Sequence, residues 1–104
     1  MSVAVPIPEL AAALAAYPWG YLVTVSDRQR AHSLAAPTAY ADGVFTVPAG
    51  RGTRANAGAR PEVTMLFPPA DGTGYSLIVD GDAVVFDDRV EVTPTSAVLH
   101  RPAL

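Results

Sequence analysis

The stretch VFTVPAGRGTRANAGARPEVTMLF, residues 44–67, holds the pattern that decides the fold. Its two ends, residues 44–47 and 63–67, are runs of β-branched, aromatic and aliphatic residues that predict strands. Between them, a glycine- and arginine-containing loop leads into the alanine-rich segment 53–60, which predicts a short helix that Pro61 ends. The predicted order is therefore strand, loop, helix, strand.

Further predicted strands lie on both sides of this stretch and are joined by polar turns. They comprise residues 21–25, 31–41, 75–80 with 83–86, and 89–93. Pro37 indicates an edge strand or a bulge, Asp42-Gly43 predicts a hairpin turn, and Gly81 indicates a bulge. Residues 8–17, rich in alanine and leucine, predict a leading helix. Short strands joined by tight turns favour a mainly β barrel over a parallel sheet with crossover helices.

The composition indicates how the chain assembles and which partners it is not expected to bind. The 104 residues have the usual size of one domain, so we expect residues 1–104 to form a single domain. Half of them are hydrophobic and 16% are charged, which is more apolar than the surface of a small soluble domain requires. A subunit interface would bury that excess. The net charge of −3 and the lack of lysine argue against nucleic acid or an anionic membrane as a partner.

The chain also lacks the signs of disulfides and of membrane insertion. Without cysteine, neither a disulfide framework nor a thiolate metal site can form. The apolar stretch 1–25 has no basic start and is interrupted by Pro6, Pro8, Glu9 and Pro18, which argues against a signal peptide or a membrane span. We therefore expect a cytoplasmic protein.

The loop AGRGTR, residues 49–54, is the strongest candidate for a binding site. Glycines permit close approach to the backbone, and the following helix offers N–H groups and a positive dipole end. Arg51 and Arg54 can form bidentate hydrogen bonds with a phosphate, and Thr53 can donate its hydroxyl to the same oxygens. The alternative interpretation is that Thr53 caps the helix and both arginines are solvated. The loop is not a Walker motif, because the lysine and the glycine spacing are absent.

In the order and spacing of its segments, the chain resembles the pyridoxamine 5′-phosphate oxidase-like split barrels. The resemblance rests on YLVTV at 21–25, DGVFT at 42–46, the Arg/Gly/Thr loop with Asn56, RPEVTMLF at 60–67 and YSLIVDGDA at 75–83. It implies a six-stranded antiparallel split β-barrel with an N-terminal helix and a short inserted helix, paired as a homodimer. It also implies a flavin-dependent oxidoreductase with flavin mononucleotide (FMN) in a groove at the dimer interface. The cofactor-binding residues that it implies are Thr46, Val47, Arg51, Gly52, Thr53, Arg54 and Asn56.

Two departures from the family pattern bear on function. Many members carry a lysine in the phosphate loop where this chain has Thr53, so the charge must come from Arg51 or Arg54. The chain also stops soon after residue 98, without the longer C-terminal portion that forms the vitamin-substrate site of the true oxidases, and we do not expect pyridoxamine phosphate oxidation. The alternatives to FMN are a deazaflavin, a haem-type ligand, or a non-catalytic dimeric module that binds another small anion or nothing.

No catalytic residue or metal-ligand set emerges from the remaining polar and aromatic residues. His32 alternates with apolar neighbours, which favours a packed or surface strand residue over a catalytic base. Trp19 and Tyr21 can stack on a flavin ring, although aromatics at the start of a strand more often fill a core or an interface. His100 and Arg101 can close over a partner's ligand, the alternative being solvation near the C-terminus. Turns and solvated strand edges account for Asp80, Asp82, Asp87 and Asp88.

Overall fold

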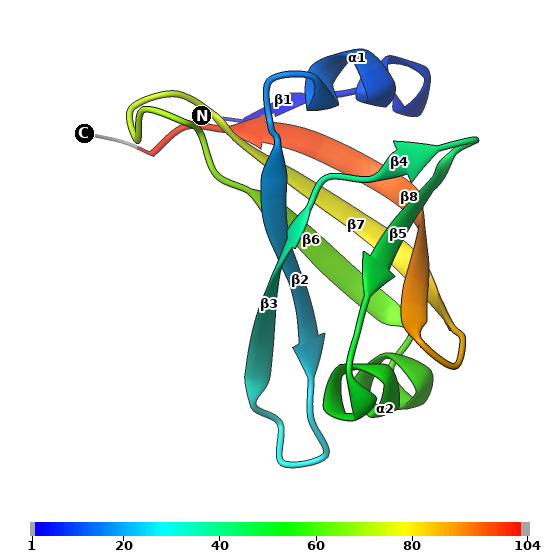
Figure 1. Ribbon diagram of the computed structural model, residues 1–104. Coiled ribbons are helices and arrows are strands. Elements are labelled where there is room, and N and C mark those ends of the chain that lie inside the picture. Colours follow the sequence, from blue (N-terminus) through cyan, green and yellow to red (C-terminus); the bar gives the residue numbers. More distant parts are fainter. Residues whose placement is uncertain (1, 103–104) are drawn as a thin grey trace.

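The computed structural model describes residues 2–102, which form one curled antiparallel sheet with a helix at each end (Figure 1). The strands are β1 (Ser2–Ala4), β2 (Trp19–Val25), β3 (Ala31–Pro37), β4 (Tyr40–Ala41), β5 (Val44–Pro48), β6 (Glu62–Phe67), β7 (Ser76–Val85) and β8 (Arg89–His100). A single 3-10 turn, η1 (Ile7–Glu9), precedes the helix α1 (Leu10–Leu14), and α2 (Arg51–Ala59) connects β5 to β6. The predicted antiparallel β barrel with a leading and an inserted helix is thus confirmed.

The sheet has eight strands within residues 2–102 rather than the six expected, because β1 and β4 are added. The predicted strand 31–41 is broken: β3 ends at Pro37 and β4 begins at Tyr40. Thr38 makes the break, since its N–H donates to the Pro18 carbonyl at 2.9 Å and its hydroxyl donates to the Tyr17 carbonyl. In the strand order β3-β2-β6-β7-β8-β5-β4, the two halves of this segment lie at opposite ends of the sheet. The break is therefore the point at which the chain crosses between the two sheet edges.

The structure confirms the predicted turn at Asp42-Gly43 and the predicted bulge at Gly81. Asp42 and Gly43 have φ values of 53° and 78°, which identifies the two-residue turn between β4 and β5. The pairing of β7 with β8 shifts register between Asp80 and Gly81. That bulge also explains why β8 continues through Pro94, far beyond the predicted end at residue 93, because a bulge spares proline a ladder hydrogen bond. Pro37 lies in β3, at one end of the strand order, as an edge position requires.

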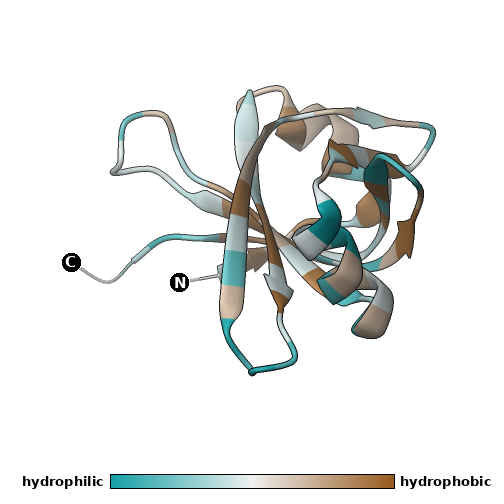
Figure 2. Cartoon of the chain, turned by 60° about the horizontal axis from the view of Figure 1, so that its bottom comes forward, coloured by the Kyte–Doolittle hydropathy of each residue, from teal (hydrophilic) through white to brown (hydrophobic). Residues whose placement is uncertain are grey.

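The core lies inside the curl, where alternate residues of the strands point inward. Phe45 and Phe67 are fully buried and stack with ring centroids 5.7 Å apart, although β5 and β6 are not neighbours in the sheet. At the α1 end, Leu10 and Leu14 cover the core, and at the other end Ala57 of α2 is buried. Figure 2 shows hydrophobic residues along the strands and hydrophilic residues at the tip of the β2–β3 hairpin. The two helices therefore close opposite ends of the barrel.

Gly20 marks the tightest packing between β2 and the core. A Cβ atom there would lie 2.5 Å from Cδ1 of the buried Phe67 ring and 2.8 Å from the Leu66 carbonyl oxygen. We expect Gly20→Ala to lower the free energy of unfolding by about 1–3 kcal/mol, because the ring and the strand must shift. Urea unfolding followed by circular dichroism measures the change.

Gly58→Ala is the matched control for this substitution. Its added Cβ would have its nearest neighbour, the Val85 Cγ2 atom, at 3.8 Å, which is ordinary contact. Since alanine favours a helix over glycine, we expect an unchanged or higher stability, by up to about 1 kcal/mol. Equal losses in the two variants would contradict this account of the packing at Gly20.

Candidate functional site

The first turn of α2 is open to ligands. Gly50 precedes the helix with an extended backbone, φ −76° and ψ −179°, and no side chain caps the helix start. A Cβ atom added at Gly50 or Gly52 would have no neighbour within 4 Å. The alternative interpretation that Thr53 caps the helix is therefore wrong, because Thr53 lies within the first turn. The N–H groups of this turn have no acceptor within the helix and are available to an anion.

The two arginines of this loop differ in their surroundings. Arg51 is exposed, and no hydrogen bond or ion pair of its side chain occurs within residues 2–102. Arg54 is half-buried and donates from Nη1 to the Ala49 carbonyl oxygen at 2.7 Å. Solvation of both arginines, the sequence-based alternative, thus applies to Arg51 alone. Arg54 instead braces the loop that carries Arg51.

The strand residues of the predicted site, Thr46 and Val47, lie in β5 just before this loop and point to opposite faces of the sheet. Val47 is 1% exposed and its side chain belongs to the core, so only its backbone groups can form interactions. Thr46 points to the opposite, outer face of β5, and its register partner on β8 is Glu91. Glu91 is itself paired with Arg89 at 2.9 Å. The assignment of Thr46 and Val47 to a cofactor site stays a prediction.

Asn56 lies on α2 but faces the β2–β3 hairpin. Its Nδ2 donates to the Thr24 hydroxyl at 3.2 Å, and Thr24 is only 2% exposed. Gly52 and Thr53 precede Asn56 by four and three residues, so they lie on the same face of the helix, one turn toward its start. The face of α2 that carries the predicted residues therefore runs along the hairpin.

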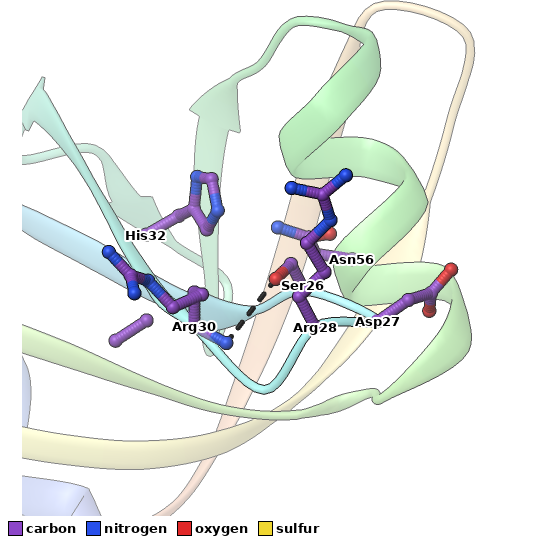
Figure 3. Close-up of a pocket in the computed structure, with 7 residues that line it drawn as sticks. Ser26, Asp27, Arg28, Arg30, His32 and Asn56 are labelled. Atoms are coloured by element: carbon purple, nitrogen blue, oxygen red, sulfur yellow. Dashed lines mark hydrogen bonds between the residues drawn. The ribbon is translucent and has the colours of Figure 1, made fainter.

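A cavity of about 830 Å³, within the range of ligand sites, lies between that face and the hairpin. The residues lining it are Ser26, Asp27, Arg28, Arg30, Ala31, His32 and Asn56. Figure 3 shows the Arg28 side chain rising in front of Asn56, with Arg30 and His32 on the β3 side. We call the surface formed by Arg28, Arg30, His32 and Asn56 the basic groove.

The hairpin positions these side chains through its turn and its register. Gln29 donates its N–H to Ser26 and has φ 62°, and the Ser26 N–H donates to Arg30, both at 2.9 Å. Because His32 is the register partner of the inward-facing Thr24, it lies on the face of the hairpin turned toward α2. From the sequence, this turn is predicted only as polar, and His32 as a packed or surface strand residue. The sequence signal that could have indicated this surface is the pair of arginines around the turn, in a chain that has no lysine.

The charge of the basic groove is not compensated within its lining. Asp27 is the carboxylate in the lining. Arg60, the residue that follows α2, binds it, with 2.8 Å between Arg60 Nη2 and Asp27 Oδ1. The Arg28 and Arg30 side chains have no hydrogen bond or ion pair in the part of the chain that the structure describes. A chain with a net charge of −3 thus presents a locally positive surface.

Arg89, at the start of β8, provides a contrast to the groove arginines. It donates to Glu91 at 2.9 Å and to Asp88 at 3.0 Å, and its guanidinium lies 4.2 Å from the centroid of the Phe86 ring. Hydrogen bonds to Glu91 and Asp88 raise the pKa of Arg89 above its ordinary value. Its charge is thus already balanced, which makes it a suitable control for the groove arginines.

The end of the barrel opposite α2 holds the C-terminal candidates. The His100 ring is 3.0 Å from the Ser2 hydroxyl, and the Arg101 guanidinium lies 5.9 Å from the centroid of the Tyr75 ring. Nearby, the Tyr17 hydroxyl donates to the Tyr75 carbonyl at 2.7 Å, and burial raises the pKa of Tyr17. Within one chain, His100 and Arg101 are therefore far from the basic groove (Figure 1).

The outer face of the sheet carries a continuous apolar row. Tyr21, Leu66, Ile78 and Val98 are successive register partners across β2, β6, β7 and β8, and all four are half-buried. Trp19, 44% exposed, extends the row with its ring edge-on to Tyr21 at 5.3 Å between centroids. We call these five residues the apolar row. It places Trp19 and Tyr21 on the outside of the barrel rather than in its core.

Within residues 2–102, no three side chains capable of metal binding gather into a group. None of the helices in this part of the chain has the length and hydrophobicity needed to cross a membrane.

Solved structures share the fold of this chain. A candidate pyridoxamine 5′-phosphate oxidase of Listeria innocua superposes with a TM-score of 0.74 at 15% identity, covering 89% of this chain and 96% of the other. An FAD-binding protein of Mesorhizobium loti gives 0.70 at 17% identity, covering 95% and 96%. An F420 reductase gives 0.59 at 21% identity, covering 88% and 92%. The chain thus has the split-barrel fold of the pyridoxamine 5′-phosphate oxidase-like, flavin-binding proteins, as the resemblance implied.

No family model matches the sequence. Two curated mycobacterial proteins, one of Mycobacterium bovis and one of Mycobacterium tuberculosis, are each 44% identical to it over 120 residues. Each alignment covers 95% of this chain and 82% of the relative, and both relatives are uncharacterised. The chain belongs to the same family as these two mycobacterial proteins.

The hydrogen bond between Asn56 and Thr24 should fix α2 against the hairpin. We expect Asn56→Ala to lower the free energy of unfolding by about 1–3 kcal/mol, because the buried Thr24 hydroxyl loses its partner. In the background of Thr24→Val, which removes that hydroxyl, the same substitution should cost clearly less. Thermal and urea unfolding of the four proteins give the coupling energy, and strictly additive effects would contradict the proposed link.

Proposed function

We propose that this protein binds a flavin or deazaflavin cofactor, with FMN as the first candidate, and acts as an oxidoreductase in the form of a homodimer. The observation that carries the proposal is the open first turn of α2, with the unpaired, exposed Arg51 between two glycines. The split-barrel fold supports it, because neighbours of the same fold include an FAD-binding protein and an F420 reductase.

The residues at the start of α2 fit the phosphate of such a cofactor. The glycines leave room for a tetrahedral anion, the first-turn N–H groups point outward from the helix end, and Arg51 adds a charge-assisted hydrogen bond. Thr53, half-buried on the same turn, offers a hydroxyl donor. Arg54 has a positioning role, since its bond to Ala49 holds the loop in which Arg51 lies. A bound flavin or deazaflavin ring would supply hydride chemistry, so the chain need provide only binding and orientation.

The apolar row supports the homodimer. It crosses four strands without a charged residue and is too large to be a set of scattered surface hydrophobics. A two-fold pairing through this row would bury the apolar excess of the composition, and isologous pairing is the commonest form of oligomer. Trp19 and Tyr21 would then lie at the edge of the interface, where an aromatic ring system can also stack.

The second candidate is a non-catalytic dimeric module that binds another small anion. The observation that favours it is the lysine-free phosphate loop. An F420 reductase among the structural neighbours favours testing a deazaflavin beside FMN. One titration separates these candidates.

The test of the cofactor proposal is a fluorescence titration of the purified protein with FMN and with a deazaflavin. We expect saturable binding of at least one of them, and Arg51→Ala should weaken it about ten- to a hundredfold through loss of one charge-assisted hydrogen bond. Thermal unfolding should be unchanged, since Arg51 is exposed and unpaired.

Arg89→Ala is the matched control and should leave the affinity within about twofold, because the Arg89 guanidinium, although it lies beside this loop in the register of β5 with β8, is already paired with Asp88 and Glu91. Absence of binding of either cofactor at concentrations on the order of tens of micromolar would favour the non-catalytic module. Binding that Arg51→Ala leaves untouched would place the phosphate elsewhere.

Two substitutions in β7 test the dimer proposal. Ile78→Asp places a charge in the middle of the apolar row, and we expect it to convert a dimer into a monomer at micromolar concentration, because an unpaired buried carboxylate is strongly disfavoured. Light scattering after size exclusion measures the mass, and circular dichroism checks the fold.

Val84→Asp is the control on the same face of β7. Val84 is 57% exposed and lies six residues from Ile78, about 20 Å along the strand. We expect this variant to stay dimeric. A wild-type protein that is monomeric at micromolar concentration would contradict the dimer and remove the second half of the proposed cofactor site.

A further inference from the structure

The outer face of the sheet carries carboxylates on one side of the apolar row and a histidine on the other. Two residues from Ile78 along β7, toward the β7–β8 turn, lies Asp80, whose register partner on β8 is Ser96. Two residues from Ile78 in the opposite direction lies Ser76, whose register partner is His100. Because a strand rises about 3.3 Å per residue, each of these pairs lies about 7 Å from the row. The two pairs are therefore equidistant from the row, on opposite sides of it.

The negative charge beside Asp80 extends further along the sheet. Asp82 of β7 and Glu62 of β6 are register partners one step beyond Asp80, on the same face. All three carboxylates are exposed, and none of them forms an ion pair within residues 2–102. Asp80 accepts a hydrogen bond from the Thr64 hydroxyl at 2.7 Å, which leaves its charge in place. This side of the outer face thus carries uncompensated negative charge.

Two copies can pair through the apolar row about either of two symmetry axes. In aligned face-to-face packing of two sheets, the two-fold axis lies between the sheets and runs either along the strands or across them. The apolar row crosses the strands and would meet its own copy with either axis. The charges on the two sides of the row therefore decide between the two orientations.

An axis along the strands would bring like charges together. It keeps every residue at the same position along the strand direction, so Asp82 and Glu62 of one copy would face the same two residues of the other. Four exposed carboxylates would then meet, and like charges that face each other across an interface are disfavoured. The charge pattern therefore disfavours this axis.

An axis across the strands, parallel to the apolar row, exchanges the two sides of the row. Asp80 and Ser96 of one copy then face Ser76 and His100 of the partner subunit, because the two pairs lie at equal distances from the row on the same two strands. A carboxylate thus lies beside an imidazole in place of a second carboxylate. The contact occurs twice in the dimer.

The same rotation matches apolar residues at the β2 end of the row. Trp19 and Val23 lie two residues on either side of Tyr21 and share its face of β2. Rotation about an axis across the strands places the exposed Trp19 ring over Val23 of the partner subunit. Rotation about an axis along the strands would place the ring over the polar end of β8 at His100. Apolar contact and charge therefore favour the same orientation.

We propose that two copies pair through the apolar row about a two-fold axis that runs across the strands, with Asp80 of each beside His100 of the partner subunit. This rests on the proposed function, which includes the homodimer. The carboxylates act by making the other orientation unfavourable, since the apolar row alone fits both. Because α1 and α2 close opposite ends of the barrel (Figure 1), this orientation sends the two α2 helices to opposite ends of the dimer.

The orientation is tested by the distance between two spin labels, for which the cysteine-free chain needs no background substitution. Val84→Cys carries the label on the outer face of β7, six residues and about 20 Å from Ile78. An axis across the strands doubles this offset, so we expect pulsed electron paramagnetic resonance to give an inter-label distance of roughly 40 Å. A distance of roughly 10–20 Å, set by the spacing of packed sheets, would overturn the proposal. Absence of any inter-label distance would overturn the dimer itself, which keeps the two failures distinct.

Exchange of charges across the interface is the second test, measured as the dimer dissociation constant by sedimentation. His100→Asp should raise this constant at least about fivefold, because it places a carboxylate beside Asp80 of the partner subunit. Adding Asp80→Arg to the same chain should return it to within about twofold of the wild type. The control is His100→Asp with Asp87→Arg, which has the same net charge but changes a residue in the β7–β8 turn, and it should not restore the dimer. Equal restoration by both arginines, or by neither, would contradict the contact between Asp80 and His100.

Discussion

Burial of the stacked Phe45 and Phe67 rings is the constraint on which the rest of the structure depends. The two phenylalanines come from β5 and β6, which are not neighbours in the sheet, so the rings meet only if the sheet curls around them. The curl requires one chain crossing between the sheet edges, which the break at Thr38 supplies, and a close approach of β2, which Gly20 permits. It also leaves two open ends that the helices must cover.

The position of α2 follows from that closure and in turn creates the candidate site. The helix covers one end of the barrel with small side chains, and Ala57 is its one buried residue among those described. Because so little of α2 is buried, most of its surface faces ligands or solvent. Its two polar anchors, Asn56 on Thr24 and Arg60 on Asp27, hold it along the β2–β3 hairpin. Closing the barrel therefore brings two arginine-bearing segments, separated by some twenty residues of chain, to one opening.

The two faces of the sheet differ in the residues that they carry. The inward face supplies the packed core, while the outward face carries the apolar row in the middle and carboxylates toward the β7–β8 bulge. Strand alternation makes this division unavoidable, because each strand shows one side to the core and the other to the outside. An apolar outer row is costly for an isolated barrel, and this cost is the reason for which we propose a paired molecule.

Local sequence was sufficient for the features that depend on neighbouring residues. The strand runs, the Asp42-Gly43 turn, the bulge at Gly81 and the helix before Pro61 each follow from backbone preferences within a few residues, and the glycine- and arginine-containing loop marked the open helix start. Only the tertiary structure decided what depends on register and closure: Val47 is in the core, Thr46 faces Glu91, and Arg54 turns back onto Ala49. The basic groove and the apolar row belong to this second group. Each is formed by residues from different segments, and no local preference specifies which segments a closed sheet brings together.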